Sequence, residues 1–455
     1  MTTQAPLWAH QQRAIDYVSE QWRNGHPGVL LDVSMRAGKS RISVELIKEH
    51  DLARVLIVSL LSVVPVWAEE SVKWGGPPVE TLDSGSVAQK AVRAFNARKV
   101  GRAIAVNYDS AFRGALAKLL LGFEWDLVVW DEVHKLKQPG GQWSRFAARI
   151  RDRSRYRLGL SGTLLPHSPL DAYGIYRAID QRVFGTSNTA FKNRYANFIN
   201  VGFPKLLSYK NLDELHEKMY SIAFHAGREA LDLATPVEMR RYCELGPKAM
   251  KAYRDLEREF VADLEGGSIV ADNALVRILR LSQVASGIAS LESSEQVIDS
   301  AKEDLLAEVL EEIGNESVVV FCRFKAELAA VDRVSHKLGR MHFELSGAAK
   351  GLELWKRWKD PAILAVQYQS GGVGIDLSKA RHAIFFSPTW SLADFQQAQA
   401  RLERHDQKEA PAYIYLVARS TVDTRAYQAL AERKEIIKSV VQSYGGGSNG
   451  NTGTD

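Results

Sequence analysis

The chain is poor in cysteine and in long apolar runs, and each shortage argues against a class of protein. Cys243 and Cys322 are the only two cysteines, and they lie too far apart for metal-ligand spacing, so neither a disulfide framework nor a zinc site is expected. The longest apolar run, VLIVSLLSVVPVWA, is broken by serine and proline, and the N-terminus lacks the pattern of a signal peptide. We therefore expect a cytoplasmic protein that does not enter a membrane.

Net charge is also small. The 59 lysines and arginines outnumber the 54 aspartates and glutamates by 5. This excess is compatible with a nucleic-acid partner but does not require one. A protein that moves along nucleic acid needs a local basic surface, and its net charge can be small.

The pattern of apolar runs predicts the fold class. At 455 residues the chain exceeds the size at which one hydrophobic core stops growing. Short β-branched runs alternate with helical patterns in two stretches, which predicts an α/β fold of two parallel-sheet lobes covered by helices. The expected strands are GVLLDV, RVLIVSL, AIAVNY, DLVVWDE and YRLGLSG, then SVVVFCRF, HFELSG, AILAVQY, HAIFFSP and AYIYLVA.

Three segments follow from this pattern. Residues 1–232 are expected to form lobe 1 with a helical extension, and 233–440 lobe 2 with an N-terminal helical segment. Between the two sets of strands, residues 171–312 are expected to be mostly helical. The glycine-rich end, 441–455, is expected to be a disordered tail.

The segment SMRAGKSR contains half of a phosphate-binding loop. The full pattern is G-x-x-x-x-G-K-[ST], in which backbone N–H groups and the lysine contact phosphates and the hydroxyl contacts Mg²⁺. Gly38, Lys39 and Ser40 are present, whereas Val33 occupies the first glycine position. The segment lies between an expected strand and an expected helix, as the motif requires. Taken alone, the segment fits a second interpretation equally well, namely a loop with a lysine at the start of a helix and no bound phosphate.

An acidic pair follows another expected strand. Asp131 and Glu132 come directly after DLVVW. One carboxylate at such a position can hold Mg²⁺, and a second can orient and deprotonate an attacking water. The alternative is a helix N-cap with an acidic first turn.

Two further sequence patterns are typical of sites that bind phosphate groups. Ser161, Gly162 and Thr163 follow YRLGL, and Arg401 and Arg404 lie three residues apart in an expected helix. Arginines at this spacing share a helix face and could act as arginine fingers on one phosphate. The alternative for them is a solvated helix face.

The order of these motifs resembles the Swi/Snf-type branch of helicase superfamily two. MRAGKS resembles its M-G-x-G-K-T loop, LLSVVPVW its P-L-S-x-x-x-x-W motif, and DEVHKLK its acidic, DEAH-like box followed by lysine. Later motifs are matched, in order, by LSGTLLPHSPLDAYGIY, TPVEMRRYCELGPKAMKAY, SGGVGIDLSKARHAIFFSPTWS and QAQARLERHDQ. The resemblance covers about residues 5 to 430 and implies two tandem RecA-like lobes.

The resemblance implies an ATP site with Mg²⁺. Gln11 would read adenine, Lys39 would contact the β and γ phosphates, Ser40 and Asp131 would hold Mg²⁺, and Glu132 would activate water. Arg36, Ala37 and Gly38 would complete the loop. From lobe 2, Arg401 and Arg404 would reach the γ-phosphate, and Gly374, Asp376 and Gln407 would line the site. Ser161 and Thr163 would couple nucleotide state to lobe closure.

The resemblance also implies contacts with a nucleic-acid backbone. These would come from Ser59, Ser62, Asn107, Tyr108, Ser346, Gly347, Lys350 and Trp390. Five further arginines alternate from Arg149 to Arg157, and we interpret them as a solvated surface in preference to a phosphate track. Arg36 stands where the family has glycine, so either the loop conformation differs or backbone strain is tolerated there.

The expected function is an ATP hydrolase that is stimulated by nucleic acid and moves along duplex DNA as a monomer. Two alternatives stay open: a helicase that separates, anneals or branch-migrates strands, and a nucleic-acid clamp or assembly subunit gated by ATP. The compact form suits a bacterial cell or one infected by phage.

Overall fold

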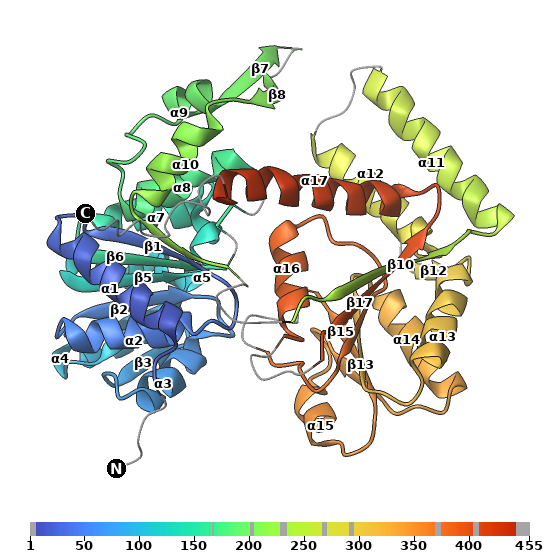
Figure 1. Cartoon of the computed structure of the whole chain (residues 1–455), viewed down its shortest axis with the longest axis horizontal. Coiled ribbons are helices and arrows are strands. Elements are labelled where there is room, and N and C mark those ends of the chain that lie inside the picture. Colours follow the sequence, from blue (N-terminus) through green and yellow to red (C-terminus); the bar gives the residue numbers. More distant parts are fainter. Residues whose placement is uncertain are drawn as a thin grey trace, which may run out of the picture. The chain divides into compact units, whose positions relative to one another are not determined.

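The structure, a computed structural model, describes residues 6–162, 164–165, 168–200, 204–227, 234–265, 271–290, 295–368, 375–403 and 409–442. The chain divides into two compact units, unit 1 with residues 1–232 and 433–455 and unit 2 with residues 233–432. Each unit contains one parallel sheet flanked by helices, which confirms the predicted α/β fold class (Figure 1). Of the predicted tail, residues 443–455 lie outside the described residues.

Unit 1 contains a seven-stranded sheet with the order β3-β4-β2-β5-β6-β1-β9, in which every pair is parallel. All five strands predicted for this lobe are present. The two edge strands were not predicted, because each is short and lacks a continuous apolar run. The strands are β1 (Gly28–Val33), β2 (Val55–Ser59), β3 (Val79–Leu82), β4 (Ala103–Asn107), β5 (Trp125–Asp131), β6 (Ser154–Ser161) and β9 (Ala223–Ala226).

Helices connect these strands. α4 shows how the sequence sets a helix start: Ser86 accepts a hydrogen bond from the Gln89 backbone N–H, and the Gln89 side chain accepts one from the Ser86 N–H. The helices are α1 (Ala9–Arg23), α2 (Lys39–Glu49), α3 (Val64–Lys73), α4 (Val87–Lys99), α5 (Tyr108–Ala111), α6 (Gly114–Gly122), η1 (Val133–Leu136), α7 (Gln142–Arg151), η2 (Pro169–Asp171), α8 (Ala172–Ile179), α9 (Asn188–Tyr195) and α10 (Leu212–Tyr220).

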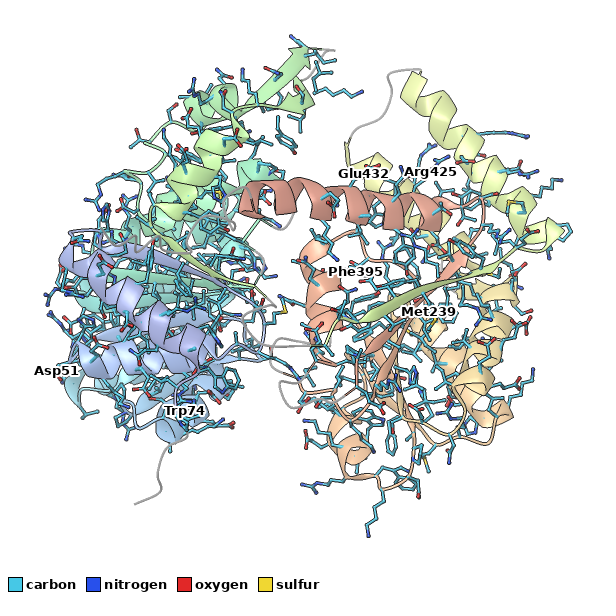
Figure 2. The ribbon with its side chains drawn as sticks, viewed as in Figure 1. Asp51, Trp74, Met239, Phe395, Arg425 and Glu432 are labelled. Atoms are coloured by element: carbon cyan, nitrogen blue, oxygen red, sulfur yellow. The ribbon has the colours of Figure 1, made fainter. Side chains whose placement is uncertain are left out.

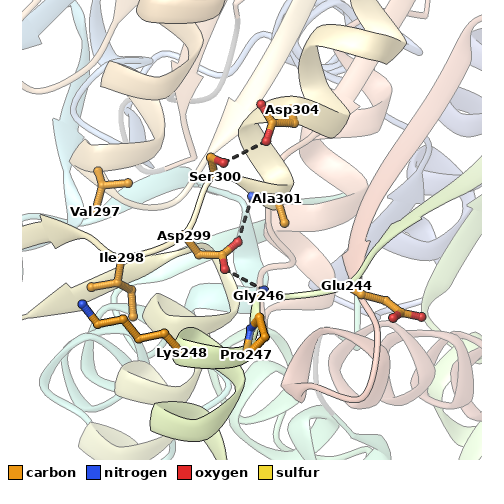
Figure 3. A pocket seen from close by; sticks show the side chains of 10 residues that line it. All are labelled: Glu244, Gly246, Pro247, Lys248, Val297, Ile298, Asp299, Ser300, Ala301 and Asp304. Atoms are coloured by element: carbon orange, nitrogen blue, oxygen red, sulfur yellow. Dashed lines mark hydrogen bonds between the residues drawn. The ribbon is translucent and has the colours of Figure 1, made fainter.

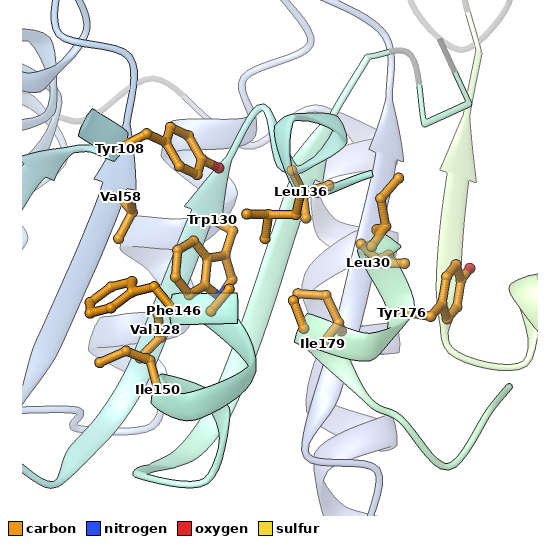
Figure 4. Packing of buried hydrophobic residues seen from close by; sticks show 14 of the residues in the cluster. Leu30, Val58, Tyr108, Val128, Trp130, Leu136, Phe146, Ile150, Tyr176 and Ile179 are labelled. Carbon is orange, nitrogen blue, oxygen red and sulfur yellow. The ribbon is translucent and has the colours of Figure 1, made fainter. Parts of the chain in front are cut away.

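The core of unit 1 packs one face of the sheet against helices. Trp130 of β5 is buried in one cluster with Phe146 and Ile150 of α7, and Val58 of β2 joins the same cluster (Figure 4). Burying an aliphatic or aromatic side chain of this size stabilises a fold by about 1.5–3 kcal/mol. This packing holds the carboxyl ends of β1, β5 and β6 in a fixed arrangement.

A two-stranded antiparallel ribbon, β7 (Ala196–Asn200) with β8 (Pro204–Tyr209), stands apart from the main sheet (Figure 1). Its root is fixed, because the buried Tyr195 donates its hydroxyl to Glu214 Oε1 at 2.9 Å and Arg194 pairs with the same carboxylate. Beyond Ala196, the described side chains of both arms are exposed up to Ser208. The ribbon is therefore anchored at one end and open to solvent along its length.

Unit 2 contains a six-stranded parallel sheet with the order β10-β17-β16-β13-β15-β14. Its five predicted strands are present, and β10 is an added, exposed edge strand. The strands are β10 (Val237–Cys243), β13 (Val318–Cys322), β14 (His342–Leu345), β15 (Ile363–Gln367), β16 (His382–Phe385) and β17 (Ala412–Ala418), with a small pair β11 (Ile288–Ser290) and β12 (Glu295–Val297). The helices are α11 (Pro247–Glu265), α12 (Ala271–Ala285), α13 (Ala301–Ile313), α14 (Lys325–Lys337), α15 (Leu352–Arg357), α16 (Leu392–Ala400) and the first half of α17 (Val422–Gln442), whose residues from 433 on belong to unit 1.

The prediction that residues 171–312 are mostly helical is wrong in part. The segment holds six strands, β7 to β12, as well as helices. β10 shows why: its residues alternate charged and apolar groups at the sheet edge, and Met239 is exposed (Figure 2). An edge strand is partly exposed to solvent, so its sequence lacks the continuous apolar run that is typical of a central parallel strand.

A buried ion pair joins two parts of unit 2. Lys302 Nζ lies 2.6 Å from Asp423 Oδ2 and donates to the Phe386 carbonyl at 3.0 Å, and both charged side chains are 1% exposed. Asp423 also accepts the Ala418 backbone N–H at 3.1 Å. The pair thus connects α13 to the start of α17.

The described residues include no helix that is both long and apolar enough to cross a membrane. Both cysteines are free, Cys322 within the core and Cys243 half-buried. Burial raises the pKa of each thiol, that of Cys243 to about 11, so neither is a reactive thiolate at neutral pH.

We predict that Lys302→Met destabilises unit 2 by about 3–5 kcal/mol, because removal of one partner leaves a buried carboxylate without its counter-charge. Denaturant unfolding of the whole chain measures this. Lys251→Met on the exposed side of α11 is the control and is expected to stay within about 0.5 kcal/mol of the parent. An equal response of both variants would contradict the role of the pair.

We predict that Glu214→Gln lowers thermal stability at pH 7 but not at pH 2. The hydrogen bond from Arg194, opposed by burial and aided by Tyr195 and Lys218, lowers the pKa of Glu214 to about 2. The folded protein therefore binds fewer protons than the unfolded chain between that value and about 4.3, so this stabilisation is complete above the range and is lost as the pH falls through it.

Melting curves at several pH values measure the difference between the parent and the Glu214→Gln variant. Glu217→Gln, on an exposed position of the same helix, is the control. A difference that is independent of pH would show that Glu214 contributes through packing and not through its charge.

Candidate nucleotide site

The candidate site lies at the carboxyl edge of the unit 1 sheet. β5, β6 and β1 are consecutive in the strand order, so the segments that follow them meet at one edge. Asp131 lies opposite Leu160, and Ser161 lies opposite Asp32. The fold thus brings the half phosphate loop, the acidic pair and the Ser161 segment together, although they are far apart in the sequence.

The loop from Ser34 to Gly38 contains two residues in the left-handed region. Arg36 has φ of 63° and Gly38 has φ of 79°. A non-glycine residue in this region carries a strain of about 1–2 kcal/mol. Of the two alternatives for Arg36, the structure supports tolerated strain: the position needs positive φ and the chain places arginine there.

Two α1 side chains hold the loop from outside. Gln11 donates its amide to the Ala37 carbonyl at 3.1 Å and accepts the Trp8 backbone N–H at 3.0 Å, and His10 Nε2 lies 2.9 Å from the same Ala37 oxygen. A Cβ atom on Gly38 would come within 2.3 Å of Gln11 Nε2. Gln11, predicted to read adenine, therefore also fixes the loop backbone.

Lys39, the first residue of α2, points back into the loop. Its Nζ donates to the Val33 carbonyl at 2.9 Å and to the Ser34 carbonyl at 3.2 Å. Burial lowers the pKa of Lys39, and the charges of Glu132, Asp131 and Asp32 oppose that shift. The ammonium thus lies among carbonyl and carboxylate oxygens, as a group that neutralises phosphate would.

Two side chains hold Asp131, one through its carboxylate and one through its backbone carbonyl. Trp67 of α3 donates its Nε1–H to Asp131 Oδ2 at 3.1 Å, and Tyr108 donates its hydroxyl to the Asp131 carbonyl at 2.8 Å. Burial and then the neighbouring Glu132 raise the pKa of Asp131 to about 7. The sequence contained Trp67 in LLSVVPVW, but only the geometry shows that it contacts the acidic pair.

Glu132 adopts φ of 53°, which turns the chain into η1. His134 Nδ1 lies 3.2 Å from Glu132 Oε2 and 3.3 Å from Ser161 Oγ. Burial raises the pKa of Glu132, but the contact and charge of His134 and the charge of Lys39 outweigh it, and the net shift is downward. Oε2 is buried, and among the described residues His134 is its close neighbour.

The donor set fits Mg²⁺ with a nucleotide. Ser40 follows Lys39 in the first turn of α2, and a hydroxyl with the Asp131 carboxylate offers the oxygen ligands that Mg²⁺ prefers. The described residues contain no group of three or more His, Cys, Asp or Glu side chains that could hold a metal by themselves. Water and phosphate would therefore complete the coordination, which is usual for Mg²⁺.

Gly162 lies against the loop. A Cβ atom there would come within 2.9 Å of Met35 Cγ and 3.5 Å of Lys39 Nζ. The Ser161 segment thus contacts both the acidic pair, through His134, and the phosphate loop. Thr163 lies outside the described residues.

Unit 2 carries the remaining predicted site residues. Asp376 Oδ1 accepts the Ser378 backbone N–H at 2.9 Å, and Arg401 is buried with its carbonyl accepting the Leu377 N–H at 3.1 Å. Gly374, Arg404 and Gln407 lie outside the described residues. Their roles, and that of Arg401, stay predictions.

Arg401 lies at the C-terminal end of α16 and has helical backbone dihedrals. α16 ends at Ala400, and Arg401 is its C-cap. Tyr413 Oη of β17 lies 2.8 Å from both the Gln399 carbonyl oxygen and Glu403 Oε1. Past Ala400 the chain continues in tighter turns, since the Leu402 and Glu403 N–H groups donate to the Gln399 and Ala400 carbonyls at 3.3 Å. Arg404 lies outside the described residues, so the shared face of the two arginines stays a prediction.

The predicted nucleic-acid residues of unit 1 are mostly buried. Ser59, Asn107 and Tyr108 are each at most 6% exposed, and only Ser62 is exposed. Asn107 accepts a hydrogen bond from the buried Lys90, a residue that the sequence did not single out. A contact between these three positions and a nucleic acid would therefore involve their backbone atoms or a shift of their side chains.

In unit 2, Ser346 and Gly347 line a pocket of about 750 Å³ together with Lys325, His342 and Gln367. Lys350 is exposed, whereas Trp390 packs partly against the cluster around Tyr253.

Arginines of unit 1 form a basic pocket of about 580 Å³. Arg113 precedes α6, and Arg145 and Arg149 lie one turn apart on α7. None of the three pairs with a carboxylate in the part of the chain that the structure describes. The interpretation of the five alternating arginines as a solvated surface is wrong for Arg157, which is buried and donates to the Ile179 carbonyl, whereas Arg149 is exposed and lines this pocket.

A second pocket in unit 2, of about 600 Å³, is structural (Figure 3). Asp299 accepts the N–H groups of Gly246 and Ala301 at 2.7 and 2.8 Å, and Ser300 donates to Asp304 at 2.8 Å. These contacts close the turns before α11 and α13, so the polar groups bind one another.

Comparison with known families agrees with this geometry. The SNF2-related domain matches residues 10–289, and the helicase conserved C-terminal domain matches residues 301–406. The chain belongs to the SNF2-related family. It is thus a Swi/Snf-type member of helicase superfamily two, as the order of motifs predicted.

Named relatives of this SNF2-related chain span a wide range of organisms. "DNA repair and recombination protein RAD54-like" of Drosophila persimilis is 23% identical over 504 residues, covering 96% of this chain and 64% of the relative. Protein p41 of Acyrthosiphon pisum secondary endosymbiont phage 1 is 26% identical, covering 78% and 80%. The solved Sulfolobus solfataricus SWI2/SNF2 ATPase core in complex with dsDNA is 22% identical, covering 97% and 94%, with a TM-score of 0.46. The chain thus spans 64% of the length of this relative and of its Drosophila pseudoobscura pseudoobscura counterpart.

We predict that Gly38→Ala weakens ATP binding and lowers stability by about 1–2 kcal/mol, because a Cβ atom at φ of 79° is strained and meets the Gln11 amide. In the Gln11→Ala background the clash is removed, so the same substitution is expected to cost less. A double-mutant cycle measured by unfolding and by ATP titration tests the coupling. Strict additivity would contradict the contact.

Proposed function

We propose that this SNF2-related chain hydrolyses ATP and uses the energy to move along duplex DNA. The observation that carries the proposal is the buried cluster at the carboxyl edge of the unit 1 sheet, where Lys39, Asp131 and Glu132 meet the phosphate loop. Phosphoryl transfer depends mainly on positioning and on neutralisation of charge, and this cluster supplies both.

Each residue has a proposed task. Lys39 would exchange its carbonyl contacts for the β and γ phosphates, and loop N–H groups would contact the same phosphates. Ser40 and Asp131 would hold Mg²⁺, which supplies positive charge beside the phosphate oxygens. Glu132 would orient the attacking water and accept its proton, and His134 beside Oε2 would hold the carboxylate in place.

Residues of unit 2 would complete hydrolysis. Arg401 and Arg404 are proposed to reach the γ-phosphate, and Gly374, Asp376 and Gln407 to line the site. Ser161, which His134 links to Glu132, and Thr163 are proposed to report nucleotide state. Closure that assembles a site in this way couples chemistry to movement.

Duplex DNA is the proposed track. The RAD54-like relatives are named for DNA repair and recombination, and the exposed arginines around Arg145 offer unpaired positive charge for phosphates. Small polar groups such as Ser62 and Ser346 would position the backbone without reading sequence. A monomer in the cytoplasm of a bacterial or phage-infected cell is proposed, and the similarity to a phage protein supports that setting.

Hydrolysis by the purified protein, alone and with duplex DNA, single-stranded DNA or RNA, tests the proposal. We expect strong stimulation by duplex DNA that is lost in Lys39→Ala and in Glu132→Gln. Displacement of a triplex-forming strand would then report movement along the duplex. Stimulation by single strands would favour a strand-separating enzyme, and no stimulation would favour an ATP-gated clamp.

We predict that the pair Arg145→Ala and Arg149→Ala weakens duplex binding and reduces the salt dependence of affinity, because each lost phosphate contact lowers the slope by about 1. Lys251→Ala, exposed on α11, is the control. Binding isotherms over a range of salt concentrations measure the slope, and an unchanged slope would remove this pocket from the proposed track.

A further inference from the structure

The β7–β8 ribbon exposes apolar side chains at a density unusual for a soluble surface. Phe198, Ile199, Leu206 and Leu207 are 37, 39, 38 and 65% exposed. Single exposed apolar residues are common, but a group of them on two short strands marks a contact surface.

The strand register determines how these side chains are arranged. Phe198 lies opposite Leu206, and Ile199 lies opposite Lys205. The register shifts between Asn197 and Phe198, because Asn197 lies opposite Ser208, and Leu207 is left as the extra residue of a bulge. The ribbon therefore presents an apolar pair, an apolar–basic pair and an unpaired leucine.

The ribbon and the chain next to it are basic, although Asp213 and Glu214 follow directly at its root. Residues 181–212 contain no aspartate or glutamate, while their basic residues are Arg182, Lys192, Arg194, Lys205 and Lys210. Arg182 pairs with Asp180 and Arg194 with Glu214, whereas the three lysines form no ion pair within the described ranges. A surface of this kind is complementary to a polyanion.

The root of the ribbon is rigid enough to position it. Asn211 donates its side-chain amide to the Arg194 carbonyl at 2.7 Å, and the Lys210 N–H donates to the Tyr195 carbonyl at 3.0 Å. Together with the Tyr195–Glu214 hydrogen bond, these contacts fix both arms where they leave the core. An isolated two-stranded hairpin is only marginally stable, so the anchoring is needed to hold the exposed side chains in place.

We propose that the β7–β8 ribbon enters a groove of the duplex DNA on which the motor moves. This inference rests on the proposed function. A two-stranded ribbon fits the major groove of B-DNA, where apolar side chains contact base edges and thymine methyl groups. Phe198, Leu206 and Leu207 supply those contacts, and Lys205 supplies a phosphate contact.

Paired serine substitutions test the proposal. Phe198→Ser with Leu207→Ser is expected to weaken duplex affinity about tenfold, because two apolar contacts with base edges are lost. The rate of ATP hydrolysis at saturating DNA is expected to stay unchanged, because neither residue lies at the nucleotide site. Val72→Ser with Val100→Ser, whose side chains are 77 and 70% exposed elsewhere in unit 1, is the matched control. Parent-like affinity of the ribbon variant would overturn the proposal.

A photoreactive amino acid at Leu207 gives a second measurement that does not depend on how the serine variant folds. Crosslinking to duplex DNA, competed by unlabelled duplex, is expected. Absence of a crosslink, or crosslinking only to protein, would overturn the proposal. If duplex DNA does not stimulate hydrolysis by the parent protein, the proposed function fails, while the crosslink still reports whether the ribbon contacts DNA.

Discussion

Burial of opposite charges at one sheet edge is the constraint on which the rest of unit 1 depends. Asp131 and Glu132 are buried there and Lys39 is half-buried, and an isolated charge in such a place is very unfavourable. Each charge is tolerated because the other two, the loop carbonyls and the indole of Trp67 surround it. The parallel sheet makes this arrangement possible, because β5, β6 and β1 are neighbours in it and their carboxyl ends bring the three groups to one edge.

The same edge contains strained backbone. Arg36, Gly38 and Glu132 all adopt positive φ, and two of the three are not glycine. Strain of this kind persists only where surrounding contacts determine the conformation, and it concentrates at functional sites. Here the contacts are Gln11 and His10 against Ala37, and η1 after Glu132. Side chains outside the motif thus hold its backbone. On α2, the Arg41 guanidinium lies 4.1 Å from the centre of the Trp74 ring.

Central strands could be predicted from the sequence because parallel strands buried on both faces give continuous apolar runs. β1, β5 and β13 are fully or almost fully buried, and each was predicted. β3, β10 and the β7–β8 ribbon were not, since edge and solvent-exposed strands mix polar and apolar residues.

The phosphate loop and acidic pair could likewise be predicted, because their chemistry lies in adjacent residues. Contacts between distant residues could not. Trp67 and Asp131 are 64 positions apart in the sequence, and Tyr413 and Gln399 are 14 apart, so each contact depends on how the chain folds. No pattern within a short window contains such information. The roles of Arg401, Arg404 and the predicted backbone contacts stay predictions.

The most direct test of the account is calorimetric titration of ATP into the parent protein and into Lys39→Met, with Mg²⁺ and without it. Methionine keeps much of the side-chain volume while removing the charge. We predict that the parent binds ATP more tightly when Mg²⁺ is present and that the variant loses at least about tenfold in affinity. Equal affinity of the two proteins would contradict the claim that this buried cluster is a nucleotide site.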